Sequence, residues 1–93
     1  MKASTALPAA REYKNVALDR IRLLALRVAQ EANEVDGDHD GRHADENEAK
    51  ALILALGHGG FLDEGKRWRL SEWIEETRMG FAPATPSIFG AKE

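Results

Sequence analysis

The sequence predicts a mainly α-helical domain with one short β-hairpin and an irregular tail. Apolar residues recur every three or four positions in two segments free of Gly and Pro, at 9–34 and 45–56, which is typical of helices that share a core. A stretch at 61–70 combines alternating residues with a turn-like Asp-Glu-Gly sequence and predicts the hairpin. With 93 residues, 43% of them apolar, the chain is large enough for one core and too small for two. We therefore expect one helical domain over residues 1–80 and an extended tail over residues 81–93.

The first helix is predicted between residues 9 and 34. Its apolar residues at spacings of three and four are Tyr13, Ala17, Ile21, Leu24, Val28, Ala32 and Val35. Pro8 lies where a helix can begin, and the glycine-containing acidic segment after residue 35 is where this helix must end. Leu23 and Leu26 lie off the apolar stripe, so we expect the helix to make contacts on a second side.

The second helix is predicted to begin at Asp45, whose side chain can accept a backbone N–H while Glu48 reaches back. Its apolar face consists of Ala49, Leu52, Ile53 and Leu56. Gly57 then provides the left-handed residue that ends a helix. Because about ten residues join the first two helices, we expect them to fold back on each other as an antiparallel pair.

The β-hairpin is predicted over residues 61–70, with its turn at residues 63–65. A third, shorter helix is predicted from its cap Ser71 to about Met79, where Gly80 ends it. The residues that follow include prolines, a glycine and small side chains, so the tail should be irregular, although its few apolar side chains can dock in a groove.

The composition excludes some classes of site. The chain has no Cys, so it can form neither a disulfide nor a thiolate metal site. Its formal net charge of −3 argues against nucleic-acid binding, which usually needs a basic face. No apolar run reaches the ~20 residues of a membrane span, and the N-terminus lacks the apolar run of a signal peptide. We expect a soluble cytoplasmic protein that does not bind membranes.

Six carboxylates lie within residues 36–48. Asp36, Asp38 and Asp40 alternate and are followed by a glycine, and over about thirty residues this segment with its flanking helices resembles an EF-hand. The resemblance implies a calcium site that Glu48 closes, one residue later than the family's twelfth position, which is Asn47 here. The alternative is a solvated linker in which Glu48 belongs to the helix cap, and in that case no cofactor is expected.

Histidines in and after this segment are a second candidate for metal binding. His39 and His43 are four residues apart, which on a helix would let them share a divalent ion with nearby aspartates. In a glycine-broken loop the spacing has no such meaning, and two exposed histidines are the simpler interpretation. His58 follows the second helix and is interpreted as facing its terminal carbonyls.

A basic and aromatic cluster lies on the predicted hairpin. Lys66, Arg67 and Arg69 surround Trp68, an arrangement that can contact phosphates and stack on a base. With a helix on either side, the hairpin resembles the wing of a winged-helix domain, but the preceding helix is acidic and has the wrong sign for a DNA groove. The alternative is that Trp68 and Trp73 are core aromatics and that neighbouring glutamates pair with the cations.

The function that fits best is that of a small non-enzymatic interaction or regulatory protein that docks on a larger macromolecule. No metalloprotease helix motif, phosphate-binding loop or nucleophilic Cys is present. The candidate partner-binding residues are the surplus apolar positions Leu23, Leu26, Phe81, Ile88 and Phe89. The acidic segment can steer a basic protein partner. An accessory or inhibitor protein of a phage or mobile element would have this character, and a homodimer is compatible with it.

Overall fold

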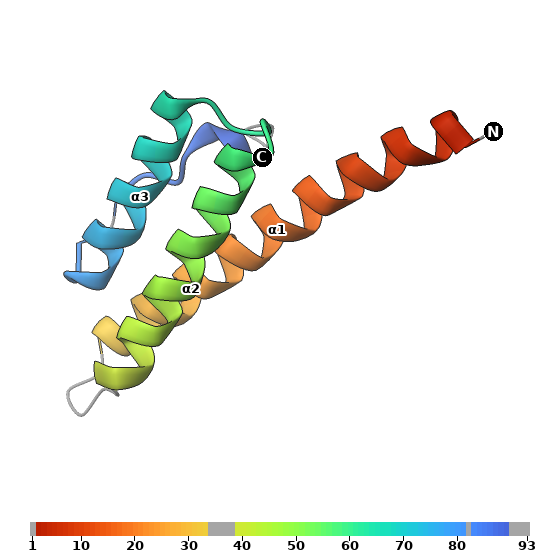
Figure 1. Cartoon of the computed structure of the whole chain (residues 1–93). Coiled ribbons are helices and arrows are strands. Elements are labelled where there is room, and N and C mark those ends of the chain that lie inside the picture. Colours follow the sequence, from red (N-terminus) through yellow and green to blue (C-terminus); the bar gives the residue numbers. More distant parts are fainter. Residues whose placement is uncertain (1, 34–38, 82, 90–93) are drawn as a thin grey trace.

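The computed structural model describes residues 2–33, 39–81 and 83–89. It consists of α1 (Lys2–Ala32), α2 (His39–His58), α3 (Glu64–Arg78) and a short 3₁₀ helix, η1 (Ser87–Phe89). Helix α2 folds back along the second half of α1, and α3 packs against both, so that the tail returns across the bundle (Figure 1). The mainly helical class and the α1–α2 pairing are confirmed.

The predicted β-hairpin is wrong, because residues 64–78 form helix α3 and the described residues contain no strand. Asp63 has an extended backbone, and its Oδ1 accepts the backbone N–H of Lys66 at 2.8 Å, which caps the helix. The buried residues of α3 are Leu70, Trp73, Ile74 and Thr77. This stripe has the helical period, and its burial outweighs the turn-like composition of the cap. Ser71, predicted as a cap, therefore lies inside the helix.

Both long helices begin earlier than the sequence predicted. Helix α1 begins at Lys2, so Pro8 lies inside it and not at its start. Helix α2 begins at His39, so Asp45 lies within the helix, where its carboxylate is 3.3 Å from Arg27 of α1. This ion pair connects residues distant in the sequence and is invisible to local capping rules. Val35 and the rest of the α1–α2 connection lie outside the described residues.

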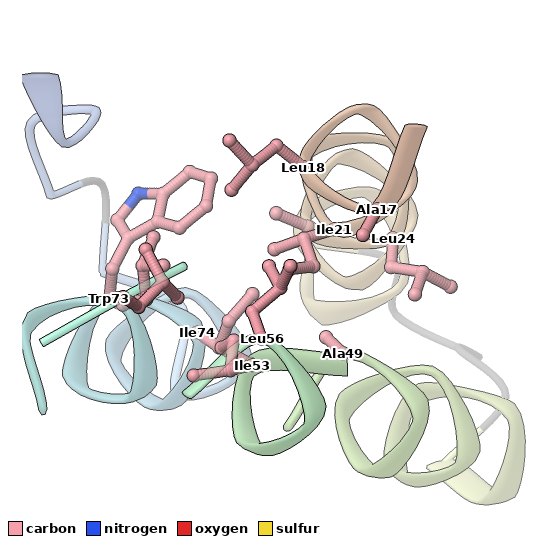
Figure 2. Packing of buried hydrophobic residues seen from close by; sticks show 12 residues of the cluster. Ala17, Leu18, Ile21, Leu24, Ala49, Ile53, Leu56, Trp73 and Ile74 are labelled. Atoms are coloured by element: carbon pink, nitrogen blue, oxygen red, sulfur yellow. The ribbon is translucent and has the colours of Figure 1, made fainter. Parts of the chain in front are cut away.

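The core lies where the three helices meet. Helix α1 contributes Ala17, Leu18, Ile21, Leu24, Ala25 and Val28, α2 contributes Ala49, Ile53 and Leu56, and α3 with its preceding turn contributes Leu62, Leu70, Trp73 and Ile74. In Figure 2, Leu18 and Ile21 of α1 point toward Trp73 and Ile74 of α3, and Leu56 of α2 lies among these side chains. Most of the apolar faces predicted for the first two helices are therefore buried, whereas Ala32 and Leu52 are partly buried and Tyr13 stays half exposed.

Helix α1 is longer than its partners require. Its 31 residues span roughly 46 Å at 1.5 Å per residue, and the molecule measures 54 × 24 × 23 Å. Figure 1 shows the first half of α1 projecting beyond the other two helices. Its contact with the turn after α2 is made by Tyr13, whose ring centroid lies 5.7 Å from that of Phe61. None of the helices in the described part of the chain has both the length and the hydrophobicity needed to cross a membrane.

Candidate functional site

A groove of about 390 Å³ lies between α1, the C-terminal end of α3 and the start of the tail, and we call it the α1–α3 groove. Its lining residues are Arg22, Ala25, Leu26, Ala29, Asn33, Trp73, Thr77, Gly80, Phe81, Pro83 and Thr85. Two large apolar side chains in this lining stay mostly exposed, Leu26 at 60% and Phe81 at 63%. The volume is near the lower limit for ligand pockets, so the groove suits a few side chains better than a large cofactor.

The wall from α1 is a second helical stripe beside the buried one. Residues 22, 25, 26, 29 and 33 recur at spacings of three and four and so lie on one side of the helix. Ala25 and Ala29 are small and form the low part of this wall, while Leu26 stands exposed beside them. The α1 wall is therefore apolar and low along its middle.

Phe81 is held at the groove by the cap of α3. Gly80 has a left-handed φ of 92°, and its N–H donates to the carbonyl of Thr77 at 3.1 Å. The N–H of Phe81 donates to the carbonyl of Glu76 at 3.0 Å. These two bonds define a Schellman motif, in which the residue after the glycine commonly packs on the last turn of its own helix. Because that turn offers the carboxylates Glu75 and Glu76, Phe81 has no apolar partner there.

The same motif ends α2 with the opposite result. Gly60 has a φ of 82°, and the N–H of Phe61 donates to the carbonyl of Leu56 at 2.9 Å. Here the residue five positions before the phenylalanine is apolar, and Phe61 packs against the buried cluster that contains Leu56. The corresponding residue in α3 is Glu76. One difference in sequence thus leaves one phenylalanine packed and the other, Phe81, exposed.

The groove carries little charge. Among the described residues that line it, Arg22 is the only ionisable one, and no ion pair joins it to another described residue. The polar side chains beside it already have partners: the hydroxyl of Thr77 donates to the carbonyl of Trp73 at 2.7 Å, and the amide of Asn33 donates to the carbonyl of Ala29 at 2.9 Å. Within the part of the groove that the structure describes, an incoming group therefore meets apolar surface with the Arg22 cation at its edge.

Two of the four predicted calcium ligands, Asp36 and Asp38, lie outside the described residues. Asp40 belongs to the first turn of α2, and Glu48 lies about two turns further along that helix. The carboxylate of Glu48 accepts two hydrogen bonds from Arg20 of α1, at 2.9 and 3.2 Å. Among the side chains that the structure describes, those of residues 11–33, 43–81 and 83–89, no group of three or more His, Asp or Glu is placed to hold a metal ion.

The histidines of this segment are on a helix and not in a loop. His39 begins α2, and His43 follows one turn later, with its Nδ1 3.5 Å from Oε1 of Glu46. His58 is the last residue of α2, where a histidine was expected to face the terminal carbonyls. The structure therefore brings His43 to a carboxylate that other side chains already engage.

Glu46 is a buried carboxylate between α2 and α3. Its Oε1 lies 2.8 Å from Nε of Arg78, and its Oε2 lies 3.3 Å from Nζ of Lys50, which in turn is 2.7 Å from Glu75. Burial alone would raise the pKa of Glu46, but the Arg78 and Lys50 cations more than offset it, so the pKa lies below its ordinary value. Hydrogen bonds from Arg20 likewise lower the pKa of Glu48. Of the six carboxylates expected to steer a partner, Asp45, Glu46 and Glu48 are thus engaged in ion pairs between helices.

The basic and aromatic cluster is dispersed by the helix. Successive residues of a helix are 100° apart, so Lys66, Arg67, Trp68 and Arg69 point to four different sides of α3. Trp68 is 65% exposed, and together with Leu54 it lines a groove of about 340 Å³, the α2–α3 groove. Arg67 and Lys50 line this groove as well, and Glu64, one turn before Trp68, adds a carboxylate to it, so of the predicted cluster only Arg67 and Trp68 share this groove.

The other predicted partner-binding residues have different surroundings. Ile88 and Phe89 are half buried and pack against the core, with the Phe89 ring centroid 5.1 Å from that of Trp73. Leu23 is half exposed on α1 and does not line the groove. Of the five candidates, only Leu26 and Phe81 meet at one surface.

Sequence analysis missed most of the groove. The signal on α1 was the stripe that begins at Arg22 and includes Ala25 and Ala29, which passes unnoticed because small residues carry little weight in an apolar pattern. The contribution of Trp73 and Thr77 could be recognised only with residues 64–78 assigned to one helix. The approach of Phe81 to α1 follows from the packing of three helices and has no local signal.

The comparisons with known proteins give no further constraint on the site. No protein-family model, no curated protein and no solved structure matches this chain.

Proposed function

We propose that this chain is a small non-enzymatic protein that binds a partner protein in the α1–α3 groove. The observation that supports this most directly is the cap of α3, which holds Phe81 exposed beside Leu26 although the same motif packs Phe61, partly buried, against the core. Exposed apolar side chains gathered at a concave surface are typical of protein-binding sites. Such a protein acts by occupying or positioning its partner, as accessory and inhibitor proteins do.

The exposed apolar groups are large enough to contribute to affinity. Leu26 and Phe81 each expose more than half of their surface, and covering what remains exposed contributes roughly 2–4 kcal/mol in total. Both residues sit on elements fixed by the core and by backbone hydrogen bonds, so little side-chain and loop ordering is needed on binding. The groove therefore has the properties of a small, pre-organised contact surface.

The proposal is tested by site-specific crosslinking in cells that naturally contain the chain. A photoreactive phenylalanine analogue replaces Phe81 in one variant and Trp68 in a matched control, since the two side chains are equally exposed on different grooves. We expect a discrete protein crosslink from position 81 that disappears in the Leu26→Asp background while the far-ultraviolet circular dichroism stays unchanged. Crosslinks from position 68 alone, or crosslinks indifferent to Leu26→Asp, would refute the assignment of the groove.

A further inference from the structure

We infer that the segment received by the α1–α3 groove is an amphipathic α-helix of about three turns that places a carboxylate beside Arg22. This inference rests on the proposed function and specifies the chemistry of the partner. It concerns three properties of the groove: the backbone groups of its walls, the length and height of its α1 stripe, and its charge.

The walls favour a helix because they offer few backbone partners. Two of them are the helices α1 and α3, whose backbone groups are hydrogen-bonded within the helix. The third wall is the irregular tail, where Pro83 has no N–H to donate and only the short segment around Thr85 has backbone groups without a backbone partner among the described residues. An extended peptide in this groove would leave much of its backbone unpaired against apolar surface, which is costly, whereas a helix satisfies its own backbone.

The dimensions of the α1 wall set the length of that helix. The stripe runs from Arg22 to Asn33, which is eleven residue steps or roughly 16 Å along the helix axis and corresponds to three turns. The small, only partly buried side chain of Ala29 in the middle of the stripe lets another helix approach closely, while Leu26 and Phe81 enclose its apolar face. The bound helix would be the fourth helix of an α-helical bundle.

The charge of the groove selects an acidic edge on that helix. Arg22 is the one charged residue among the described residues of the lining, and its guanidinium has no carboxylate partner among them. The guanidinium has a geometry that suits a carboxylate, with which it can form paired hydrogen bonds. A cation on the incoming helix would meet no carboxylate in the lining.

The test uses two displayed libraries of 14-residue peptides selected against the full chain. The first fixes helix-favouring residues and varies apolar residues at positions i, i+3, i+4 and i+7, with Asp, Glu, Asn or Gln at one edge. The second has the same composition in an alternating pattern with a central proline. Selected peptides are measured by fluorescence anisotropy against the wild type, Leu26→Asp, Phe81→Asp, Arg22→Gln and the control Trp68→Asp.

We expect binders from the helical library only, with affinity reduced at least tenfold by Leu26→Asp or Phe81→Asp and unchanged by Trp68→Asp. Arg22→Gln should weaken acidic peptides about three- to tenfold, as expected for a charge-assisted contact at a partly exposed edge, and should leave their amide counterparts unchanged. If Arg22→Gln weakens the acidic peptides and their amide counterparts equally, or neither, the inference that a carboxylate of the partner binds Arg22 is refuted. Groove-dependent binders from the alternating library alone would refute the helix and leave the proposed function standing. The absence of groove-dependent binders from both libraries would overturn both.

Discussion

At the scale of single residues, Phe61 and Phe81 occupy the same place in two copies of one motif and differ in what lies beneath them. Phe61 packs on the cluster that contains Leu56, whereas Phe81 faces the groove. We expect Phe61→Ala to lower the free energy of unfolding by about 1–3 kcal/mol, because it removes partly buried apolar contacts. Phe81→Ala should change it by less than about 0.5 kcal/mol. Urea unfolding with equal m-values measures both, and equal losses would show that Phe81 is packed within the chain.

Glu46 carries the second prediction at this scale. Glu46→Gln leaves Arg78 and Lys50 facing a neutral group, so we expect the free energy of unfolding at pH 7 to fall by about 1–3 kcal/mol. The pKa of Glu46 is lower in the folded state than its ordinary value of 4.5, so its stabilisation is complete above pH 4.5 and disappears as the pH falls through the folded-state pKa. The difference in the free energy of unfolding between Glu46→Gln and the wild type, measured by urea unfolding, should therefore become smaller as the pH falls toward 3.

The control for that measurement is Glu48→Gln. Glu48 pairs with Arg20 at an exposed position, where screening by water makes an ion pair weak. We expect Glu48→Gln to lower the free energy of unfolding at pH 7 by less than Glu46→Gln does. A larger cost for Glu48→Gln, or a Glu46→Gln deficit that is independent of pH, would contradict the assignment of the buried pair.

At the scale of elements, substitutions at two glycines, Gly65 and Gly80, test whether residues 64–78 form the observed helix or the hairpin that their composition suggests. Gly65 lies in the first turn of α3, where an added Cβ would meet only an ordinary contact 3.6 Å from Oδ1 of Asp63. Gly65→Ala should therefore raise the free energy of unfolding by about 0.5 kcal/mol, whereas Ala at Gly80, with a φ of 92°, should lower it by about 1 kcal/mol. Thermal unfolding of the two variants decides between the structures, because a hairpin turn with left-handed Gly65 would make Gly65→Ala destabilising.

The elements also show which features a sequence can predict. The apolar faces of α1 and α2 follow from periodicity over long segments, and Ile21, Leu24 and Leu56 are fully buried as that pattern requires. The helix starts do not follow: α2 begins six residues before Asp45, the predicted cap, whose carboxylate instead pairs with Arg27, a residue distant in the sequence. Helix α3 was missed because a turn-like cap outweighed the stripe from Leu70 to Thr77, although that stripe is in the sequence.

At the scale of the whole molecule, the candidate site depends on an arrangement that the sequence does not state. Leu26 and Phe81 can each be identified as surplus apolar residues, but their common groove exists because the C-terminal end of α3 packs beside α1. The exposure of Phe81 has a local cause, the glutamates of the last turn, which the sequence contains and which becomes informative only with the cap of α3 known. The surface is therefore a property of packing, built from residues whose types were recognisable.

The projection of α1 gives the last prediction, which concerns the shape of the molecule in solution. The radius of gyration of the Cα atoms is 14.5 Å, against about 12 Å for a compact domain of this length, and the first half of α1 accounts for the difference (Figure 1). We expect small-angle scattering to give the larger value for the full chain and a value nearer 12 Å after deletion of residues 1–10. The deletion should cost less than about 1 kcal/mol of stability, because packing of the apolar face supplies most of a helix's stability and, among residues 11–33 of the first helix and its end, the buried ones begin at Ala17. The mass from forward scattering distinguishes an extended monomer from self-association. A compact full-length chain would instead show that the start of α1 folds back on the bundle.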